Sequence, residues 1–164
     1  MPPPLKAAAA FGIAYRPMTD QDLPFVARLY ATTRAQELAA TGWTPEAKAA
    51  FLDQQHRAQH AYYRGAYTGA EWLIVEKAGE AIGRLYLAQG DEALLLVDIS
   101  LLPEWTGRGI GGAILADLIA QARKERRPIG LHVEKRNPAQ FLYRRLGFAF
   151  VEDKGIYDRM EWRP

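Results

Sequence analysis

The stretch Glu104-Trp-Thr-Gly-Arg-Gly-Ile-Gly-Gly-Ala113 places four glycines within six positions, between an apolar run at 93–102 and a helical pattern. The first backbone N–H groups of a helix have no partner within the helix, and the helix dipole adds positive charge at the same end. Glycines remove the side chains that would keep an anion from these groups. A turn from strand to helix needs only one glycine, so the surplus predicts a phosphate cradle.

Two classes of phosphate ligand fit this loop. Gly107, Gly109 and Gly112 match the dinucleotide fingerprint G-x-G-x-x-G, and Glu134 ends a later strand, where a ribose-binding acid is expected. However, more than a hundred residues precede the loop, whereas a dinucleotide motif normally opens its domain. The 52 residues after Gly112 are too few for a doubly wound sheet. These lengths disfavour a dinucleotide.

The composition narrows the class of protein. Among the 164 residues, 49% are hydrophobic and 24% are charged, which is typical of one globular domain. We expect that domain at 11–164, after a flexible leader at 1–10. A formal net charge of +2 is too small to indicate nucleic-acid binding, and no apolar stretch reaches membrane length. There is no cysteine to act as a nucleophile, and the His56/His60 pair lacks a third metal ligand. We expect a cytoplasmic protein without a bound metal.

Hydrophobic periodicity and capping signals predict alternating strands and helices. Thr19 and Asp22 form a capping box before one helix, and Thr44-Pro45 begins another that ends near Gly65. The helix at 109–126 has an apolar residue at every fourth position from Ile110 to Ala122. Another helix is expected at 138–146. Strands are expected at 11–18, 71–77, 81–88, 93–101, 129–134, about 147–152 and 156–162, with a tight turn at Gly79-Glu80.

The order strand, Pro-Glu-aromatic, Gly-Arg-Gly-Ile-Gly-Gly, helix, strand and then 137-NPAQFLYRRLGF-148 resembles the Gcn5-related N-acetyltransferases (the GNAT family). The resemblance covers about residues 13–162. It implies an α/β fold in a single domain, with a mixed, splayed central sheet flanked by helices. It also implies transfer of an acetyl group from acetyl-coenzyme A to a primary amine by direct attack in a ternary complex. Members of the family often form dimers, so a homodimer is a further expectation.

The family motif carries over to particular residues. Thr106 stands where glutamine or arginine is usual, and the amides from Arg108 to Gly112 are expected to surround the pyrophosphate of coenzyme A. Asn137 matches an asparagine that contacts the pantetheine arm, although it precedes Tyr143 by six residues, one fewer than the commonest spacing. The cofactor-binding residues implied by the resemblance are Ile99, Ser100, Leu101, Thr106, Gly107, Arg108, Gly109, Ile110, Gly111, Gly112, Asn137 and Tyr143.

Acetyl transfer requires a base for the amine, a stabilised oxyanion and a departing thiolate. Tyr143 matches the tyrosine that protonates or hydrogen-bonds the sulfur, although it also has apolar neighbours that suit a core ring. A backbone N–H near Leu101 is expected to meet the oxyanion. Three residues remain candidates for the base. His132 titrates near neutral pH and shares a strand face with Glu134, whereas Asp98 is the lone acid of its apolar strand. Water alone is a further alternative.

The acceptor is expected to be a small-molecule or peptide amine. Five aromatic residues fall where the family builds its acceptor cleft, and they are Trp43, Tyr62, Tyr63, Tyr67 and Trp72. Most of them are expected in the core, and a few would suit an apolar or aromatic amine. Two alternatives stay open. One is a coenzyme A-binding sensor or partner module with weak catalysis, and the other is an enzyme for longer acyl chains. Neither nucleic acid nor a membrane is an expected partner.

Overall fold

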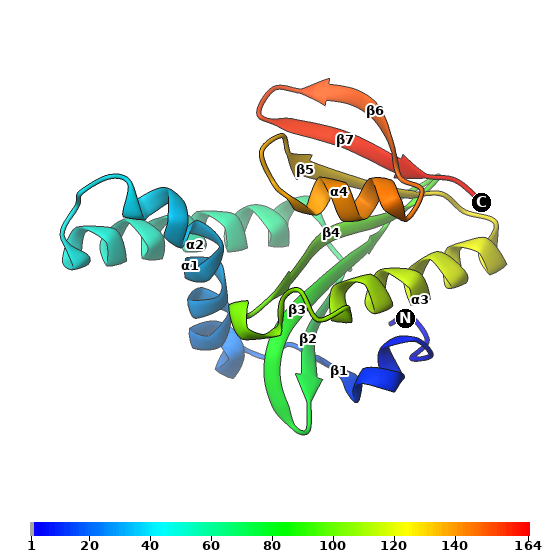
Figure 1. Ribbon diagram of the computed structural model, residues 1–164, viewed down its shortest axis with the longest axis horizontal. Coiled ribbons are helices and arrows are strands. Elements are labelled where there is room, and N and C mark those ends of the chain that lie inside the picture. The colour runs from blue at the N-terminus through cyan, green and yellow to red at the C-terminus, as the bar shows by residue number, and fades with distance from the viewer. Residues whose placement is uncertain (1) are drawn as a thin grey trace.

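The computed structural model describes residues 2–164, which form one α/β domain around a seven-stranded sheet (Figure 1). The order of strands in the sheet is β1-β2-β3-β4-β5-β7-β6. The strands are β1 (Ile13–Pro17), β2 (Glu71–Lys77), β3 (Glu80–Gln89), β4 (Leu94–Leu101), β5 (Ile129–Glu134), β6 (Ala149–Lys154) and β7 (Tyr157–Trp162). The helices are α1 (Leu23–Ala39), α2 (Pro45–Ala66), α3 (Ile110–Glu125) and α4 (Ala139–Arg145).

Among residues 2–164, β4 and β5 are the only parallel pair of strands, and the sheet splits between them. These strands are paired over three positions, from Leu94–Ile129 to Leu96–Leu131. Beyond this point β4 continues to Leu101 and β5 to Glu134, but the two strands no longer pair with each other and diverge (Figure 1). The expectation of a mixed, splayed sheet is confirmed. The divergence leaves one edge of β4 without a neighbouring strand.

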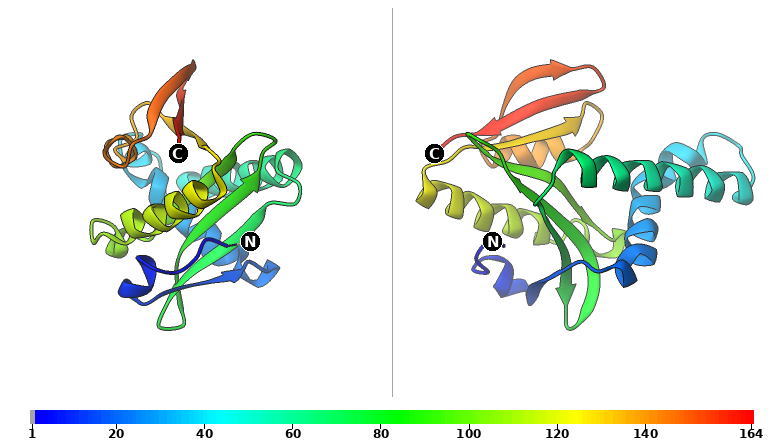
Figure 2. Two further views of the ribbon diagram at one scale, coloured as in Figure 1. Left: turned by 90° about the vertical axis from the view of Figure 1, so that its right-hand side faces the viewer. Right: turned by 180° about the vertical axis from the view of Figure 1, so that it is seen from behind.

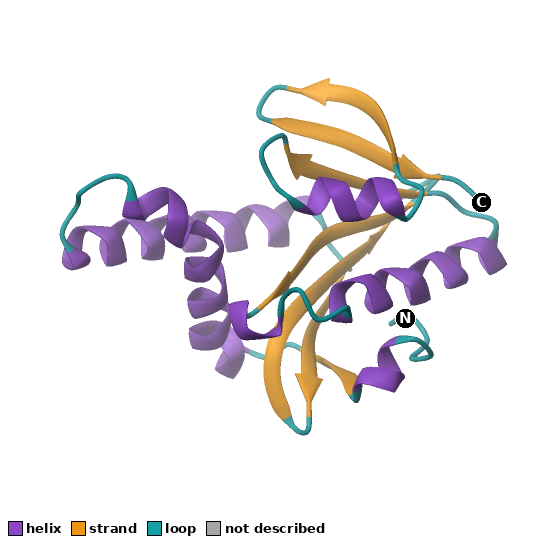
Figure 3. Ribbon diagram, in the orientation of Figure 1, coloured by secondary structure: helices purple, strands orange, loops and turns teal. Residues whose placement is uncertain are grey.

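The helices cover both faces of the sheet (Figures 2 and 3). The predicted apolar positions of α3 are buried from Ile110 to Ala122 and belong to the same hydrophobic core as Leu73 and Val75 of β2. On the opposite face, Leu29 of α1 packs against Ile74 of the same strand. Alternate residues of β2 therefore serve two separate cores. No helix within residues 2–164 is both long enough and apolar enough to span a membrane.

The capping box before α1 is confirmed. The backbone N–H of Thr19 donates to the Asp22 carboxylate at 2.8 Å, and a short 3₁₀ turn over Asp20–Asp22 precedes the helix. Asp22 also forms a salt bridge with Arg16. The turn between β2 and β3 lies one residue earlier than expected, at Ala78-Gly79. Both residues have positive φ angles, 51° and 79°, as a two-residue hairpin turn of type I′ requires.

The segment before β1 differs from the flexible leader that the sequence suggested. A 3₁₀ helix covers Ala8–Phe11, and the side chain of Ala8 is fully buried. The backbone N–H groups of Lys6, Ala7 and Ala8 donate to the carboxylate of Asp117 in α3, at 3.2, 2.7 and 2.9 Å. Asp117 is itself buried, so these bonds satisfy its charge. The chain before β1 is thereby attached to α3.

Candidate active site

The divergence of β4 and β5 leaves backbone groups of β4 facing open space. The Leu102 N–H donates to the carbonyl of Ile82 in β3 at 2.8 Å. In an antiparallel pair, successive residues direct their N–H and C=O groups to opposite sides. The N–H groups of Ile99 and Leu101 therefore point away from β3, into the gap beside β5. This edge offers hydrogen bonds to an extended ligand.

The glycine loop has the backbone conformation that its sequence requires. Gly107 and Gly109 have φ angles of 70° and 87°, in the left-handed region that other residues avoid. Gly109 precedes α3, and no side chain caps this helix start. A Cβ at Gly111 would have no heavy atom within 4 Å, and one at Gly112 would approach only Leu142, at 3.8 Å. Packing does not require these two glycines, and the absence of side chains at both positions leaves the first amides of α3 uncovered.

A cavity of about 740 Å³ lies between this loop, the end of β4 and the start of α4. We call it the loop cavity. Every expected cofactor-binding residue lines it except Arg108 and Ile110. The Ile110 side chain is 2% exposed and belongs to the core, whereas the Arg108 guanidinium lies over the Trp105 ring. The other residues that line the cavity were not predicted from the sequence, and they are Leu115, Pro138, Ala139, Leu142 and Arg145.

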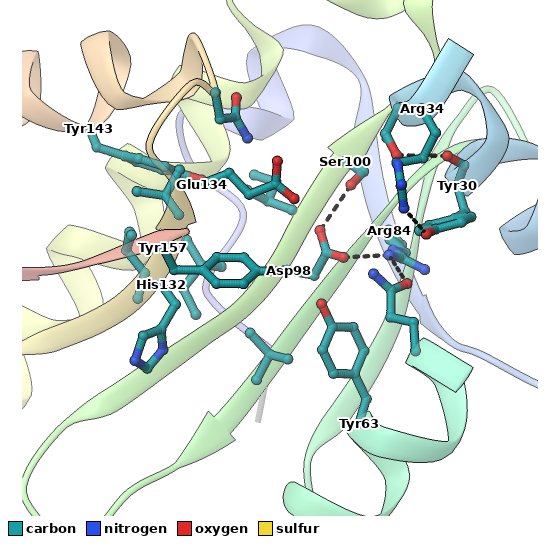
Figure 4. Close-up of a pocket in the computed structure, with 18 of the residues that line it drawn as sticks. Tyr30, Arg34, Tyr63, Arg84, Asp98, Ser100, His132, Glu134, Tyr143 and Tyr157 are labelled. Atoms are coloured by element: carbon teal, nitrogen blue, oxygen red, sulfur yellow. Dashed lines mark hydrogen bonds and ion pairs between the residues drawn. The ribbon is translucent and has the colours of Figure 1, made fainter. Parts of the chain in front are cut away.

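A smaller cavity of about 260 Å³ opens on the other side of the gap, and we call it the polar cavity (Figure 4). Ile99, Ser100, Asn137 and Tyr143 line both this cavity and the loop cavity. The two cavities therefore meet where the strands separate. Asn137 stands between them, and its side-chain oxygen accepts a hydrogen bond from the Ala139 N–H at 2.9 Å. Its amide nitrogen, a potential donor, has no acceptor among residues 2–164.

Tyr143 comes from α4 and is 7% exposed. Burial raises the pKa of its phenol, and the charge of Asp98 raises it further. The ring packs against Phe148 with centroids 5.6 Å apart, whereas Phe141 is exposed on the outer side of the helix. Tyr143 therefore keeps its proton at neutral pH, as a hydrogen-bond donor must, while one side of its ring packs in the core.

A buried ion pair forms one wall of the polar cavity. The guanidinium of Arg84 is 3% exposed and is paired with the Asp98 carboxylate. It also donates to the side-chain oxygen of Gln59 at 2.9 Å, and the Ser100 hydroxyl donates to the other oxygen of Asp98 at 2.9 Å. Asp98 was predicted from the sequence, whereas Arg84 was not. The sequence did contain a signal for this ion pair, because one apolar strand holds an arginine and the next holds an aspartate.

The two remaining candidates for the base lie on β5. His132 and Glu134 are exposed, while Leu131 and Val133 are buried, as strand alternation predicted. The His132 ring is nevertheless partly desolvated, which lowers its pKa, and the charges of Arg159 and Lys154 lower that pKa further. Figure 4 shows the Glu134 side chain extending into the polar cavity and the His132 ring turned away from Asp98. Within residues 2–164, the Glu134 carboxylate has no hydrogen-bond or ion-pair partner.

The polar cavity leads outward to a third cavity of about 580 Å³, which we call the tyrosine cavity. Tyr30 of α1, Tyr157 of β7 and three tyrosines from the end of α2 and the turn after it line this space. These last three are Tyr62, Tyr63 and Tyr67. The other aromatics singled out in the sequence lie outside it: Trp43 packs against Phe51, and Trp72 packs against Tyr63 and Tyr86.

Solved structures with the same fold support the architecture. The N-acetyltransferase PaiA from Thermoplasma acidophilum, solved with coenzyme A, superposes with a TM-score of 0.70 at 18% identity, covering 93% of this chain and 99% of that one. An acetyltransferase from Thermus thermophilus gives 0.65 at 20% identity, over 93% and 97%. A GNAT acetyltransferase from Elizabethkingia anophelis with acetyl-CoA bound gives 0.59 at 18% identity, over 93% and 99%.

The sequence itself decides the family. No curated protein matches the chain significantly. The profile of the Acetyltransferase (GNAT) family, however, matches residues 30–148, which include the glycine loop, Asn137 and Tyr143. The resemblance inferred from the motifs is thereby confirmed. With its splayed sheet and glycine loop, the chain belongs to the acetyltransferase (GNAT) family.

Proposed function

We propose that this acetyltransferase moves the acetyl group of acetyl-coenzyme A to a primary amine by direct attack within a ternary complex. The observation that carries this proposal is the meeting of the loop cavity and the polar cavity at Tyr143. Direct transfer requires that two bound substrates approach each other without a covalent enzyme intermediate. The coenzyme A and acetyl-CoA complexes of the similar structures support acetyl-coenzyme A as the co-substrate.

The cofactor would extend from the glycine loop to the gap. Its pyrophosphate would lie on the open amides at the start of α3, between Gly109 and Gly112. Its pantetheine arm would run along the free edge of β4 and bond the backbone of Ile99 and Leu101 as an added strand does. The amide nitrogen of Asn137 would donate to the same arm. The thioester would then lie beside Tyr143.

The transfer can be written with atoms and electrons balanced. The nitrogen lone pair of the neutral amine attacks the thioester carbon, and the carbonyl electrons move onto oxygen. The N–H of Leu101 or Ile99 would donate to that oxyanion. When the carbonyl reforms, the C–S bond breaks and the thiolate takes the proton of Tyr143. The original ammonium loses two protons in all: one passes to solvent through the base, and the other replaces the proton of Tyr143.

Glu134 is the base that the geometry favours. Its carboxylate extends into the polar cavity without a partner among residues 2–164 (Figure 4). Both oxygens of Asp98, in contrast, already accept bonds from Arg84 and Ser100. His132 lines the same cavity with its ring turned away. Glu134 would therefore receive the first proton of the ammonium, and Asp98 would balance the charge of Arg84.

Turnover tests this proposal against a cofactor-binding module without useful catalysis. Purified protein is mixed with acetyl-coenzyme A and a panel of primary amines, and both free thiol and acetylated amine are measured. Replacing the acetyl group by a longer acyl group tests the alternative of a longer chain. The proposal predicts equal amounts of thiol and amide. Tight binding of coenzyme A without amide would favour the sensor, and faster transfer of the longer acyl group would reassign the substrate.

The variant Gly109→Asp tests whether the glycine loop holds the cofactor. It places a side chain and a negative charge in the cradle, and it should weaken coenzyme A binding at least about tenfold, or about 1.4 kcal/mol. Calorimetry measures the affinity, and a thermal melt shows whether the variant is folded. Unchanged affinity in the folded variant would remove the glycine loop from the cofactor site. Binding of NAD by the unaltered protein would restore the dinucleotide interpretation.

A further inference from the structure

We propose that the acceptor is a monoamine whose single ammonium is carried on an aromatic body, and that the protein discriminates against polyamines and lysine-rich peptides. The inference rests on the proposed amine acetyltransfer and specifies its second substrate. It follows from how charges and rings are distributed from the gap outward. One free carboxylate lies at the inner end, and aromatic rings without any carboxylate line the outer part, among residues 2–164.

The inner end provides one negative charge for a ligand. Three acids line the polar cavity. Arg84 compensates Asp98, and Arg34 holds Glu37 with its Nε 2.7 Å from the carboxylate. Glu134 is the acid that has no cation beside it among the described residues. A charge removed from water needs a partner, so the polar cavity is suited to one ammonium group.

The outer end is unfavourable for a second ammonium. The charged side chains that line the tyrosine cavity are Arg34 and Lys154, and no aspartate or glutamate among residues 2–164 lines it. Lys154 is paired with Glu152 at 3.4 Å on the exposed strand β6. His132 also lines this cavity and is biased toward its neutral form, because its pKa is lowered. The second cation of a diamine, or of a basic peptide, would find no carboxylate on this wall to pair with and would lie near the cations Arg34 and Lys154.

The walls between the two ends suit a flat ring. Tyr63 is held in an aromatic cluster, with ring centroids 6.5 Å from Trp72, 6.1 Å from Tyr86 and 6.2 Å from Tyr67. A ring fixed in this way presents a rigid surface and loses little conformational entropy when a ligand binds. Tyr30 and Tyr157 line the same space from other elements. Aromatic pairs prefer tilted or offset contacts, and about 580 Å³ accommodates a ligand of one or two rings.

Amine competition tests the inference. The full chain is assayed with acetyl-coenzyme A and phenylethylamine, tryptamine, spermidine, diaminopentane, glucosamine or a lysine-containing peptide. We expect kcat/KM for the two aromatic monoamines to exceed each of the others by at least about 100-fold, from combined ring and charge discrimination. Faster turnover of spermidine, glucosamine or the peptide would overturn the inference and leave acetyl transfer in place. Turnover of no amine would overturn both proposals.

Variants of Tyr63 test how much the aromatic wall contributes to the preference among amines. Tyr63→Ala should raise KM for phenylethylamine at least about tenfold, as loss of a buried aromatic contact does, and leave KM for butylamine unchanged. Tyr63→Phe should restore the aromatic preference. Phe150→Ala removes a 57% exposed ring from β6 and serves as the control. Equal KM changes for both amines in Tyr63→Ala would overturn the aromatic assignment.

Lys154→Glu tests the charge. It places a carboxylate at the tyrosine cavity and should raise kcat/KM for diaminopentane, relative to phenylethylamine, at least about fivefold. An unchanged ratio would overturn the charge argument. Coenzyme A affinity is also measured for every variant. It should stay unchanged, because neither Tyr63 nor Lys154 lines the loop cavity. A change in that affinity would mean that the substitution disturbs the site as a whole and would overturn the assignment of these residues to the acceptor alone.

Discussion

Gly83 is the position where one added methyl group should do the most damage. It lies in β3, paired with Val75 on one side and with Leu101 on the other. A Cβ there would lie 2.3 Å from the Ser100 carbonyl oxygen and 2.7 Å from Cδ2 of Leu101. Because the closest atom belongs to backbone, no side-chain rotation relieves the clash. In Gly83→Ala, β4 would have to move by roughly 1 Å, away from β3 and into the gap.

The structure gives the expected size of the effect. Overpacking of a core costs typically about 1–3 kcal/mol, and we expect about 3 kcal/mol because backbone must move. For a chain of this length, that corresponds to a Tm lower by roughly 6–12 °C. The moved segment carries the amides of Ile99 and Leu101. A displacement of about 1 Å at reacting groups lowers the rate by about 100-fold, so kcat/KM should fall even at temperatures where the variant is folded.

Urea unfolding, thermal melts and steady-state kinetics measure these effects. Gly65→Ala is the matched control, because a Cβ at this position in α2 has no heavy atom within 4 Å. It should stabilise the protein by about 0.5–1 kcal/mol, as glycine-to-alanine changes in helices do, and leave kcat unchanged. A Gly83→Ala protein with both the Tm and the kcat of the original would refute the close approach of β3 and β4.

Three further predictions concern the site and the pH dependence. Tyr143→Phe should lower kcat by roughly 10- to 1000-fold, the contribution of a general acid, and hold coenzyme A affinity within about tenfold; a fully active variant would leave Tyr143 with its packing role alone. Gly111→Ala should raise stability by up to about 1 kcal/mol and weaken coenzyme A binding, because the methyl group enters the loop cavity; calorimetry and melts should move in opposite directions, and tighter binding would contradict the cradle. Burial lowers the pKa values of His56, His60 and His132 below 6.5, so the unfolded chain binds more protons in acid. The free energy of unfolding should therefore be steady above about pH 6.5 and fall as the pH drops through the folded pKa values, and constant stability in urea titrations down to about pH 5 would contradict it.

Local signals predicted most elements and most of the residues that line the loop cavity. The capping box at Thr19, the fourfold spacing of α3 and the alternation of β5 each follow from interactions between residues close in sequence. The glycine loop was readable for the same reason, because a left-handed φ angle and an open helix start restrict the residue at its own position. The resemblance to a family then related the loop to Asn137 and Tyr143.

Contacts set by the register of distant strands were not predictable. Arg84 and Asp98 meet because β3 pairs with β4 in one particular register, which no local pattern specifies. The bonds from Ala7 and Ala8 to Asp117 join residues more than 100 positions apart. The free carboxylate of Glu134 became distinct from that of Asp98 only once their neighbours were known. Sequence alone therefore named the candidates for the base and could not rank them by environment.

The attachment at Asp117 has a consequence for any shortened form of this protein. A chain that began at β1 would retain every strand and every long helix, yet it would leave a buried carboxylate without the three amides that now surround it. An unsatisfied buried charge destabilises a fold more than the absence of one neutral hydrogen bond does. The effect would also reach the glycine loop, because the ring of Phe11 lies 3.3 Å from the position of a Cβ on Gly109. The smallest unit expected to fold and to hold its loop in place therefore begins at Lys6, upstream of the first strand.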